Sequence, residues 1–259
     1  MKFLKASSKL IATSTCLLMM LLMVQSCSKS ENKPNKVLQA AISPSIPPFM
    51  FENQGEPVGL DLEIFKGFCQ SRGYTYQLKS YDFQGMLGAV ASGQADVAFS
   101  GISITDQRMK VMDFSNPYVQ NTWNLVSLKK RNIHITDLSQ LKRYSIGFPT
   151  GAVFMAYITN EWQPKGIYTT NQVKLYPSVA DALTDLNNGN LDLMFTDDSM
   201  LKTYVNKFKM PLVNSYEVPY ADKLGFAFIK NSPIREDFNR YLAELGPEKI
   251  NSMEIEWSK

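Results

Sequence analysis

The hydrophobic pattern after residue 36 alternates between short β-rich runs and longer helical patterns. The β-rich runs at 37–42, 74–79 and 95–100 predict strands, and the stretches at 60–71 and 83–92 between them predict helices. This βαβαβ order implies parallel strands joined by right-handed crossovers, with ligands bound at the carboxyl ends of the strands.

A second run of the same kind begins near residue 136, so the order along the chain predicts two α/β lobes. Its predicted helices are 136–142, 151–162 and 178–188, and its predicted strands are 144–148, 173–176 and 191–195. The last 35 residues hold a predicted strand at 225–229 and helical patterns at 232–245 and 247–257. Chain order alone allows this last segment to pack on either lobe.

The first 26 residues have a different pattern from the rest of the chain. Three lysines precede an uncharged apolar run at 10–24, which is typical of a secretory signal peptide. A run of about 15 residues is short for a bilayer span, which needs roughly 20. Ser26 before Cys27 resembles the lipobox of bacterial lipoproteins, in which the cysteine is acylated, although Gln25 departs from the usual pattern. An uncleaved N-terminal anchor is the alternative.

These observations predict a signal peptide at 1–26, a palmitate-type lipid on Cys27 and a polar linker that reaches residue 36. Removing the three lysines of the signal peptide brings the formal net charge from +3 to zero, which argues against a nucleic-acid partner. In the mature chain Cys69 then has no second free cysteine to pair with, and it is predicted to be a small buried residue.

Candidate catalytic and metal-binding groups are few. His134 is the only histidine, so a histidine metal cluster is excluded, and Cys69 has no CxxC partner. A Ser-His-Asp triad would need His134, and no nucleophile-elbow sequence accompanies it. The sequence therefore predicts no cofactor, no metal and no catalytic residue.

The stretch GISITDQR at 101–108 follows the predicted strand at 95–100 and places Arg108 just inside the start of a predicted helix. Backbone N–H groups at a helix start attract anions, and a guanidinium can add a forked pair with a carboxylate worth roughly 1.5–3 kcal/mol. A surface salt bridge of little energetic value is the alternative. This stretch alone leaves both interpretations open.

Several motifs together give the chain a family resemblance. They are SIPPFMF at 45–51, GEPVGLDLEIF at 55–65, the block from YDFQGM to FSNPY at 81–118, PTGA at 149–152, LDLMFTDD at 191–198, GFAFIK at 225–230, and the closing Gly246, Ile250 and Trp257. The chain resembles a family 3 periplasmic solute-binding protein, the polar amino-acid receptors of ABC importers. The resemblance covers nearly all of the mature chain.

This resemblance implies the two-lobed α/β fold of type II periplasmic binding proteins, in which each lobe is a sheet flanked by helices. Lobe 1 is then expected at 37–119 plus 221–259, and lobe 2 at 120–220. Two strand crossings would form a hinge near 118–122 and 220–224. A ligand in the cleft favours closure only through contacts made with both lobes at once.

The resemblance also assigns the groups that hold the two ends of an amino acid. Arg108 matches the arginine that grips the α-carboxylate, with Ser103 beside it, and Thr150 and Gly151 would offer N–H groups from lobe 2. Asp197 matches the carboxylate that receives the α-ammonium.

Asp197 also follows the predicted strand at 191–195, at the carboxyl end where a cleft residue should lie. The alternative is that Asp197 or Asp198 only caps the helix that begins near Ser199.

Further positions would surround the rest of the ligand. Ser100 and Gly101 would supply a carbonyl and a close backbone approach to the ammonium. Phe83 matches an aromatic wall of the site, with core packing as its alternative. Ile46 stands where the opposite wall is usually aromatic, and Ser43 stands where the family often has an acidic residue.

Because a buried cation without a partner is costly, the missing carboxylate at Ser43 predicts that a neutral amino acid is preferred over a basic one. At a lobe 2 position where the family has a polar or basic residue, this chain has Gly147 or Phe148.

The function predicted from the sequence is that of an exported amino-acid receptor, not an enzyme. It would be a monomeric lipoprotein, anchored to the membrane on the periplasmic side, that delivers a free amino acid to an ABC permease. A cyclohexadienyl dehydratase-like enzyme is one alternative, but the sequence places no carboxylate beyond Asp197 in the cleft for acid–base chemistry. A ligand sensor or adhesin on the same fold is another.

Overall fold

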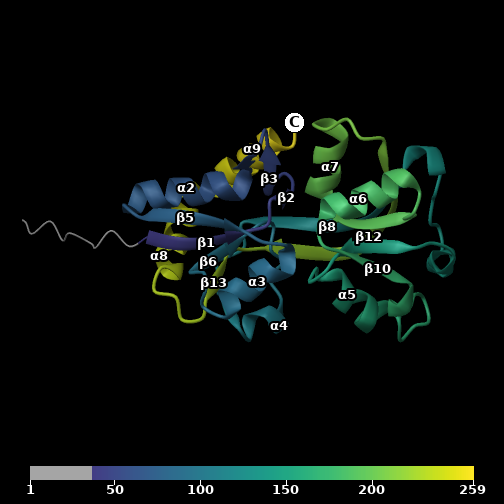
Figure 1. Cartoon of the computed structure of the whole chain (residues 1–259), viewed down its shortest axis with the longest axis horizontal. Helices are drawn as coiled ribbons and strands as arrows, with labels where there is room; N and C mark the ends of the chain where they lie inside the picture. The colour runs from purple at the N-terminus through teal and green to yellow at the C-terminus, as the bar shows by residue number, and fades with distance from the viewer. Residues whose placement is uncertain (1–36) are drawn as a thin grey trace, which may run out of the picture. The chain divides into compact units, whose positions relative to one another are not determined.

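Two five-stranded sheets organise residues 37–259, the part of the chain that the computed structural model describes (Figure 1). The strand order is β5-β1-β6-β13-β7 in the first lobe and β10-β9-β11-β8-β12 in the second. The predicted signal peptide, Cys27 and the linker to residue 36 lie outside the described residues. The prediction of a two-lobed α/β fold is confirmed.

The first lobe contains β1 and the parallel strands on either side of it. Its strands are β1 (Val37–Ile42), β5 (Thr75–Ser80), β6 (Val97–Phe99), β7 (Met112–Phe114) and β13 (Ala227–Ile229). Its helices are α2 (Leu60–Arg72), α3 (Phe83–Ala91), α4 (Asp106–Met109), α8 (Arg235–Leu245) and α9 (Pro247–Trp257). A small sheet of β2 (Ser45–Ile46), β3 (Met50–Asn53) and β4 (Glu56–Val58) stands beside them.

The C-terminal segment belongs to the first lobe. Strand β13 pairs antiparallel with both β6 and β7, so it lies inside the first sheet. This pairing decides between the two lobes, which chain order alone left open.

The second lobe repeats the same kind of architecture. Its strands are β8 (Val119–Leu128), β9 (Ile146–Pro149), β10 (Val173–Tyr176), β11 (Leu193–Asp197) and β12 (Leu212–Leu224). Its helices are α5 (Phe154–Tyr157), a π-helical turn at Ile158–Trp162, α6 (Val179–Asn188) and α7 (Asp198–Asn206). Short 3₁₀ helices occupy Lys129–Arg131, Leu138–Arg143 and Thr170–Gln172.

A long antiparallel pair, β8 with β12, joins the two lobes (Figure 1). Its register runs from Leu128 opposite Leu212 to Val119 opposite Leu224. At its first-lobe end, the Ile104 N–H donates to the Lys223 carbonyl over 2.8 Å. The pair is therefore fixed by hydrogen bonds to the loop that follows β6.

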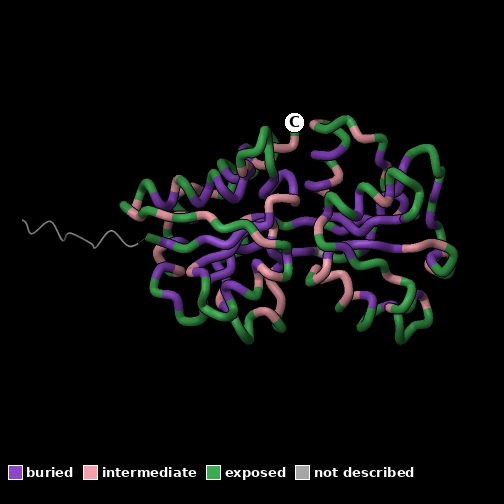
Figure 2. The backbone as a smooth tube through the Cα atoms, in the orientation of Figure 1, coloured by how far each residue is buried: buried purple, intermediate pink, exposed green. Residues whose placement is uncertain are grey.

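The buried residues follow the strands of both sheets, as Figure 2 shows. The second lobe has an aromatic core that includes Trp123, Phe148 and Phe195. Cys69 is buried on α2, as predicted. Among residues 37–259, no helix combines the length and apolar character that a bilayer crossing requires.

Candidate functional site

An inner cavity lies where loops at the carboxyl ends of the strands of both lobes meet the β8–β12 pair. Six predicted site residues line it: Ile46, Phe83, Gly101, Ser103, Arg108 and Asp197. An outer cleft of about 990 Å³ lies between α3 and α4 of the first lobe and the α5 region of the second. Arg108 and Trp123 line both spaces.

Arg108 reaches from the first lobe to the second. Its Nη1 donates to the Ser103 carbonyl over 2.7 Å, and its Nη2 donates to the Gly151 carbonyl over 3.0 Å. The guanidinium carbon stands 5.7 Å from the centre of the Phe83 ring. The guanidinium is thus occupied by these contacts and not by a surface salt bridge, which was the alternative interpretation of the sequence. It faces the space between the lobes.

The charge state of Arg108 follows from its surroundings. Burial lowers the pKa of Arg108 to about 10, while the nearby Asp222 carboxylate opposes this change. The guanidinium therefore stays positive at neutral pH and can bind an anion. Its helix, α4, has only four residues, with Thr105 accepting the Arg108 N–H, so the side chain and not a helix dipole supplies the positive charge.

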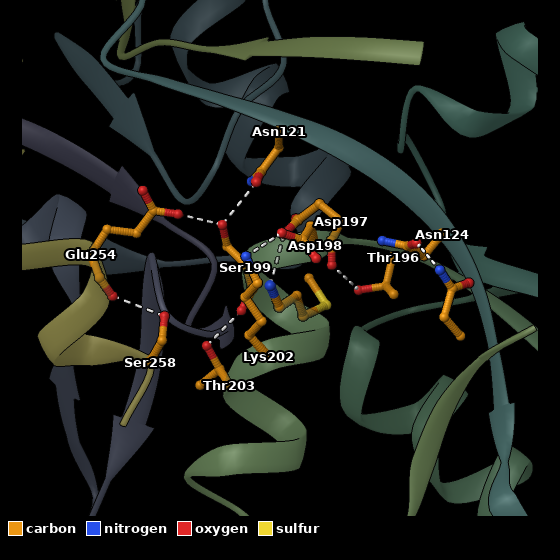
Figure 3. Close-up of polar contacts among 12 residues, drawn as sticks. Asn121, Asn124, Thr196, Asp197, Asp198, Ser199, Lys202, Thr203, Glu254 and Ser258 are labelled. Carbon is orange, nitrogen blue, oxygen red and sulfur yellow. Dashed lines mark hydrogen bonds and ion pairs between the residues drawn. The ribbon is translucent and has the colours of Figure 1, made fainter. Parts of the chain in front are cut away.

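Asp197 ends β11 and is the N-cap of α7, where it accepts the Met200 N–H over 2.8 Å (Figure 3). Asp197 also lines the inner cavity, so this one residue both caps α7 and contributes to the cavity wall. Asp198 instead pairs with Lys202 over 2.5 Å. Burial raises the pKa of Asp197 to about 7, the Met200 bond opposes this, and the charges of Asp222 and Glu254 add to it.

Asp222 on β12 is a second carboxylate of the inner cavity, and the sequence did not predict it. It is 4% exposed, and its Oδ2 accepts both the Ser103 hydroxyl at 2.7 Å and the Trp123 Nε1–H at 3.0 Å. Burial raises the pKa of Asp222, against these two bonds and the charge of Arg108. The expectation that Asp197 is the sole cleft carboxylate is therefore wrong.

Aromatic side chains of the second lobe form its wall of the inner cavity. Trp123 on β8 stands opposite Asp197 in the strand register, and its indole stacks on Tyr220 with ring centres 4.0 Å apart. Phe154 stacks on Phe195 at 4.6 Å, and both line the cavity. The period-two spacing of Phe195 and Asp197 along one strand was a signal in the sequence for this wall.

Three predicted site residues, Ser43, Ser100 and Thr150, form hydrogen bonds within their own lobes. The Ser43 N–H donates to the Ser100 hydroxyl over 2.9 Å, and both residues are buried. Thr150 donates its N–H and its hydroxyl to the Tyr176 carbonyl, over 2.8 and 3.2 Å. The predicted role of Thr150 as an N–H donor to the ligand is thus not confirmed, because the Thr150 N–H already has an acceptor.

Gly101 and Gly151 both stand at the space between the lobes. Gly101 has φ of +59°, and a Cβ there would lie 2.7 Å from the ring of Phe49, so only glycine allows this close approach. Gly151 contributes its carbonyl to Arg108.

Gly147 and Phe148 lie behind the cavity wall. A Cβ on Gly147 would meet the Tyr176 ring at 2.7 Å, and Phe148 is fully buried with its ring edge-on to Phe154. Neither residue is among those that line the inner cavity or the outer cleft, so no polar or basic side chain enters the site from this position.

A buried carboxylate supports the first-lobe side of the site. Asp61 on α2 accepts the Gly101 N–H over 2.9 Å and the hydroxyl of Tyr118, the residue before β8. Burial raises the pKa of Asp61 to about 7 despite these two bonds. Asp61 thus connects α2, the cavity loop and the start of the strand pair.

Comparison with known protein families agrees with this geometry. The sequence model of the bacterial extracellular solute-binding proteins, family 3, matches residues 38–257. The chain belongs to this family. The family 3 resemblance predicted from the sequence motifs is thereby confirmed.

Characterised relatives of this family 3 protein are amino-acid-binding proteins. The arginine-binding periplasmic protein of Mannheimia haemolytica is 30% identical over 78% of this chain and 82% of its own length. The arginine-binding extracellular protein ArtP of Bacillus subtilis is 25% identical over 91% of both chains. Among solved structures, an ancestral arginine-binding protein bound to arginine has a TM-score of 0.75 and 27% identity, covering 85% of this chain and 97% of its own.

An ancestral arginine-binding protein bound to glutamine has a TM-score of 0.73 and 28% identity, covering 85% of this chain and 97% of its own. By their descriptions, the family and these relatives are binding proteins.

Proposed function

We propose that this protein captures a free amino acid between its two lobes and delivers it to an ABC permease. The observation that carries this proposal is the placement of Arg108 and Asp197, one from each lobe, on the wall of one cavity. Arg108 would receive the α-carboxylate, and Asp197 would receive the α-ammonium through the oxygen that does not cap α7.

Ligand binding would compete with bonds inside the protein. The guanidinium of Arg108 donates to two carbonyls, and a carboxylate is the stronger acceptor because it is charged. The Ser103 hydroxyl and the ring of Phe83 lie within the same site and would contact the bound amino acid. Gly101, with Ser100 before it, would bring backbone groups close to the ammonium.

The lobe boundaries and hinge are part of the proposal. Lobe 1 comprises 37–119 plus 221–259, lobe 2 comprises 120–220, and the two connecting strands bend where they leave lobe 1. Support comes from the register irregularity of the β8–β12 pair between Val218 and Ala221, next to the proposed boundary. A ligand bound to both lobes then favours the arrangement in which they approach each other.

The proposed location is the periplasmic side of a bacterial membrane. Cleavage of the signal peptide at 1–26 and acylation of Cys27 would leave a monomeric lipoprotein, tethered by its linker and free of catalytic activity. The family description as extracellular supports export. The lipid anchor rests on the sequence pattern around Cys27.

Native mass spectrometry of the protein purified without refolding tests the proposed function. We expect an added mass that corresponds to one amino acid, and Arg108→Ala should lose it. Arg235→Ala is the matched control, because Arg235 pairs with Glu236 at the start of α8, away from the cavity. A wild-type protein that carries and binds no amino acid would overturn the proposal.

A further inference from the structure

We propose that Asp222 and Trp123, on the two strands that join the lobes, form a subsite for a positively charged ligand side chain. This inference rests on the proposed function and names the class of amino acid bound. It replaces the prediction of a neutral ligand, whose reason was the missing carboxylate at Ser43.

The charges of the inner cavity favour a ligand with a second positive charge. Of the described residues that line it, three have ionisable side chains: Arg108, Asp197 and Asp222. When the ligand's carboxylate pairs with Arg108 and its ammonium with Asp197, Asp222 is left without a cationic partner. A buried charge is stable only when it is paired, so a ligand with a second positive charge completes the site.

The carboxylate of Asp222 is held in place and can accept a further donor. Both side-chain donors, the Ser103 hydroxyl and the Trp123 indole, reach the same oxygen, Oδ2. The backbone N–H of Lys223 also bonds to this carboxylate. A carboxylate has about four lone-pair positions on its two oxygens, so Asp222 still has capacity to accept from a guanidinium or ammonium. The two fixed donors hold the carboxylate in one orientation before a ligand arrives.

Trp123 is held rigidly beside Asp222. Its indole is 1% exposed, stacks on Tyr220, and meets the ring of Phe154 edge-on at 5.1 Å, so it cannot swing away. The indole nevertheless lines the inner cavity beside Asp222. The N–H edge of the indole meets Asp222 and donates to it over 3.0 Å, so Trp123 serves the subsite by fixing the orientation of the carboxylate that receives the cation.

The alternative is that Asp222 only holds Ser103 and Trp123 in place. A purely positioning carboxylate would affect all amino acids equally, because every ligand shares the zwitterion near Ser103. A subsite for a charged side chain would affect only cationic ligands. The selectivity between ligands therefore separates the two roles.

The experiment is isothermal titration of the full chain with L-arginine and with L-citrulline, its neutral near-isostere. We expect wild-type protein to bind arginine at least about tenfold more tightly, and Asp222→Asn to reduce this preference to about twofold or less. Trp123→Phe keeps a ring but loses the N–H donor, and it should weaken the binding of arginine more than that of citrulline. Asp198→Asn, which alters an acid paired with Lys202 outside the cavity, is the matched control and should change neither ligand.

The wild-type comparison needs no variant, so it holds even where Asp222→Asn fails to fold. Equal affinity for arginine and citrulline, or a preference that Asp222→Asn leaves intact, would overturn the subsite. Either result with amino acids still bound leaves the proposed function standing. No binding of any amino acid would instead overturn the proposed function.

Discussion

Asp61 shows how one residue links folding to the site. Its carboxylate is fully buried between Gly101 and Tyr118, so the folded protein holds a proton that the unfolded chain releases at lower pH. Burial raises the pKa of Asp61 to about 7 from its ordinary 3.8. Its contribution to stability is therefore present below pH about 4 and is lost as the pH rises toward 7.

Asp61→Asn should accordingly flatten the pH dependence of stability. Because asparagine does not titrate, the fall in unfolding free energy between about pH 4 and about pH 7 should be smaller than in wild type. Asp197, whose pKa burial also raises to about 7, should leave part of the dependence in place. Urea unfolding at several pH values measures the profile, with exposed Asp106→Asn as the control. An unchanged profile in Asp61→Asn would show that Asp61 does not hold a proton in the folded protein at these pH values.

Three of the residues that line the inner cavity, Arg108, Asp197 and Phe83, were predicted from the sequence, whereas Asp222 and Trp123 were not. The first three stand at predicted strand ends, where topology brings loops together. Asp222 and Trp123 lie within long strands, and their burial depends on pairing between segments about a hundred residues apart. Local pattern cannot reveal such pairing.

At the scale of elements, α7 and α9 make a contact between the lobes (Figure 3). Ser199, in the first turn of α7, donates its hydroxyl to Glu254 of α9 and contacts the Asn121 amide on β8. Phe51 and Phe208 add an edge-on ring contact at 5.8 Å between the same lobes. These contacts stabilise one relative placement of the two lobes.

Ser199→Ala should therefore weaken amino-acid binding although Ser199 does not line the inner cavity. The Ser199 hydrogen bond stabilises this placement of the lobes by about 1 kcal/mol, so its loss should lower the affinity for the amino acid about fivefold. Ser258→Ala is the matched control, because its hydroxyl bonds to the Glu254 carbonyl within the C-terminal helical segment. Titration calorimetry measures both variants, and an affinity of Ser199→Ala equal to that of Ser258→Ala would contradict the coupling.

Most helices and strands were predictable from the sequence. Where their bounds differ from the predicted ones, the cause is local. The strand β10 and the helix α9 have the predicted bounds. The predicted helix at 151–162 begins only at Phe154, because Gly151 has φ of +83° and cannot be helical, and it ends in a π-helical turn. The predicted helix at 232–245 begins at Arg235, since the residue before Pro233 avoids the helical conformation.

Chain order predicted two α/β lobes but not which lobe receives the C-terminus. Ala227 pairs with Ala98, and this contact joins residues far apart in the sequence. Hydrophobic periodicity carries no information on such pairing, so the expected assignment came from the family resemblance. The cavity likewise exists only once both sheets and their connecting strands are in place.

Under the proposed function, the two lobes hold opposite ends of an amino-acid zwitterion, with Arg108 on the carboxylate and Asp197 on the ammonium. Isothermal titration of wild-type protein with L-arginine, L-glutamine and the α-amide of each tests this claim. The amide lacks the carboxylate, so it should bind about a hundredfold more weakly than its parent, and Arg108→Ala should abolish the difference. An α-amide that binds as tightly as its parent amino acid would contradict the claim.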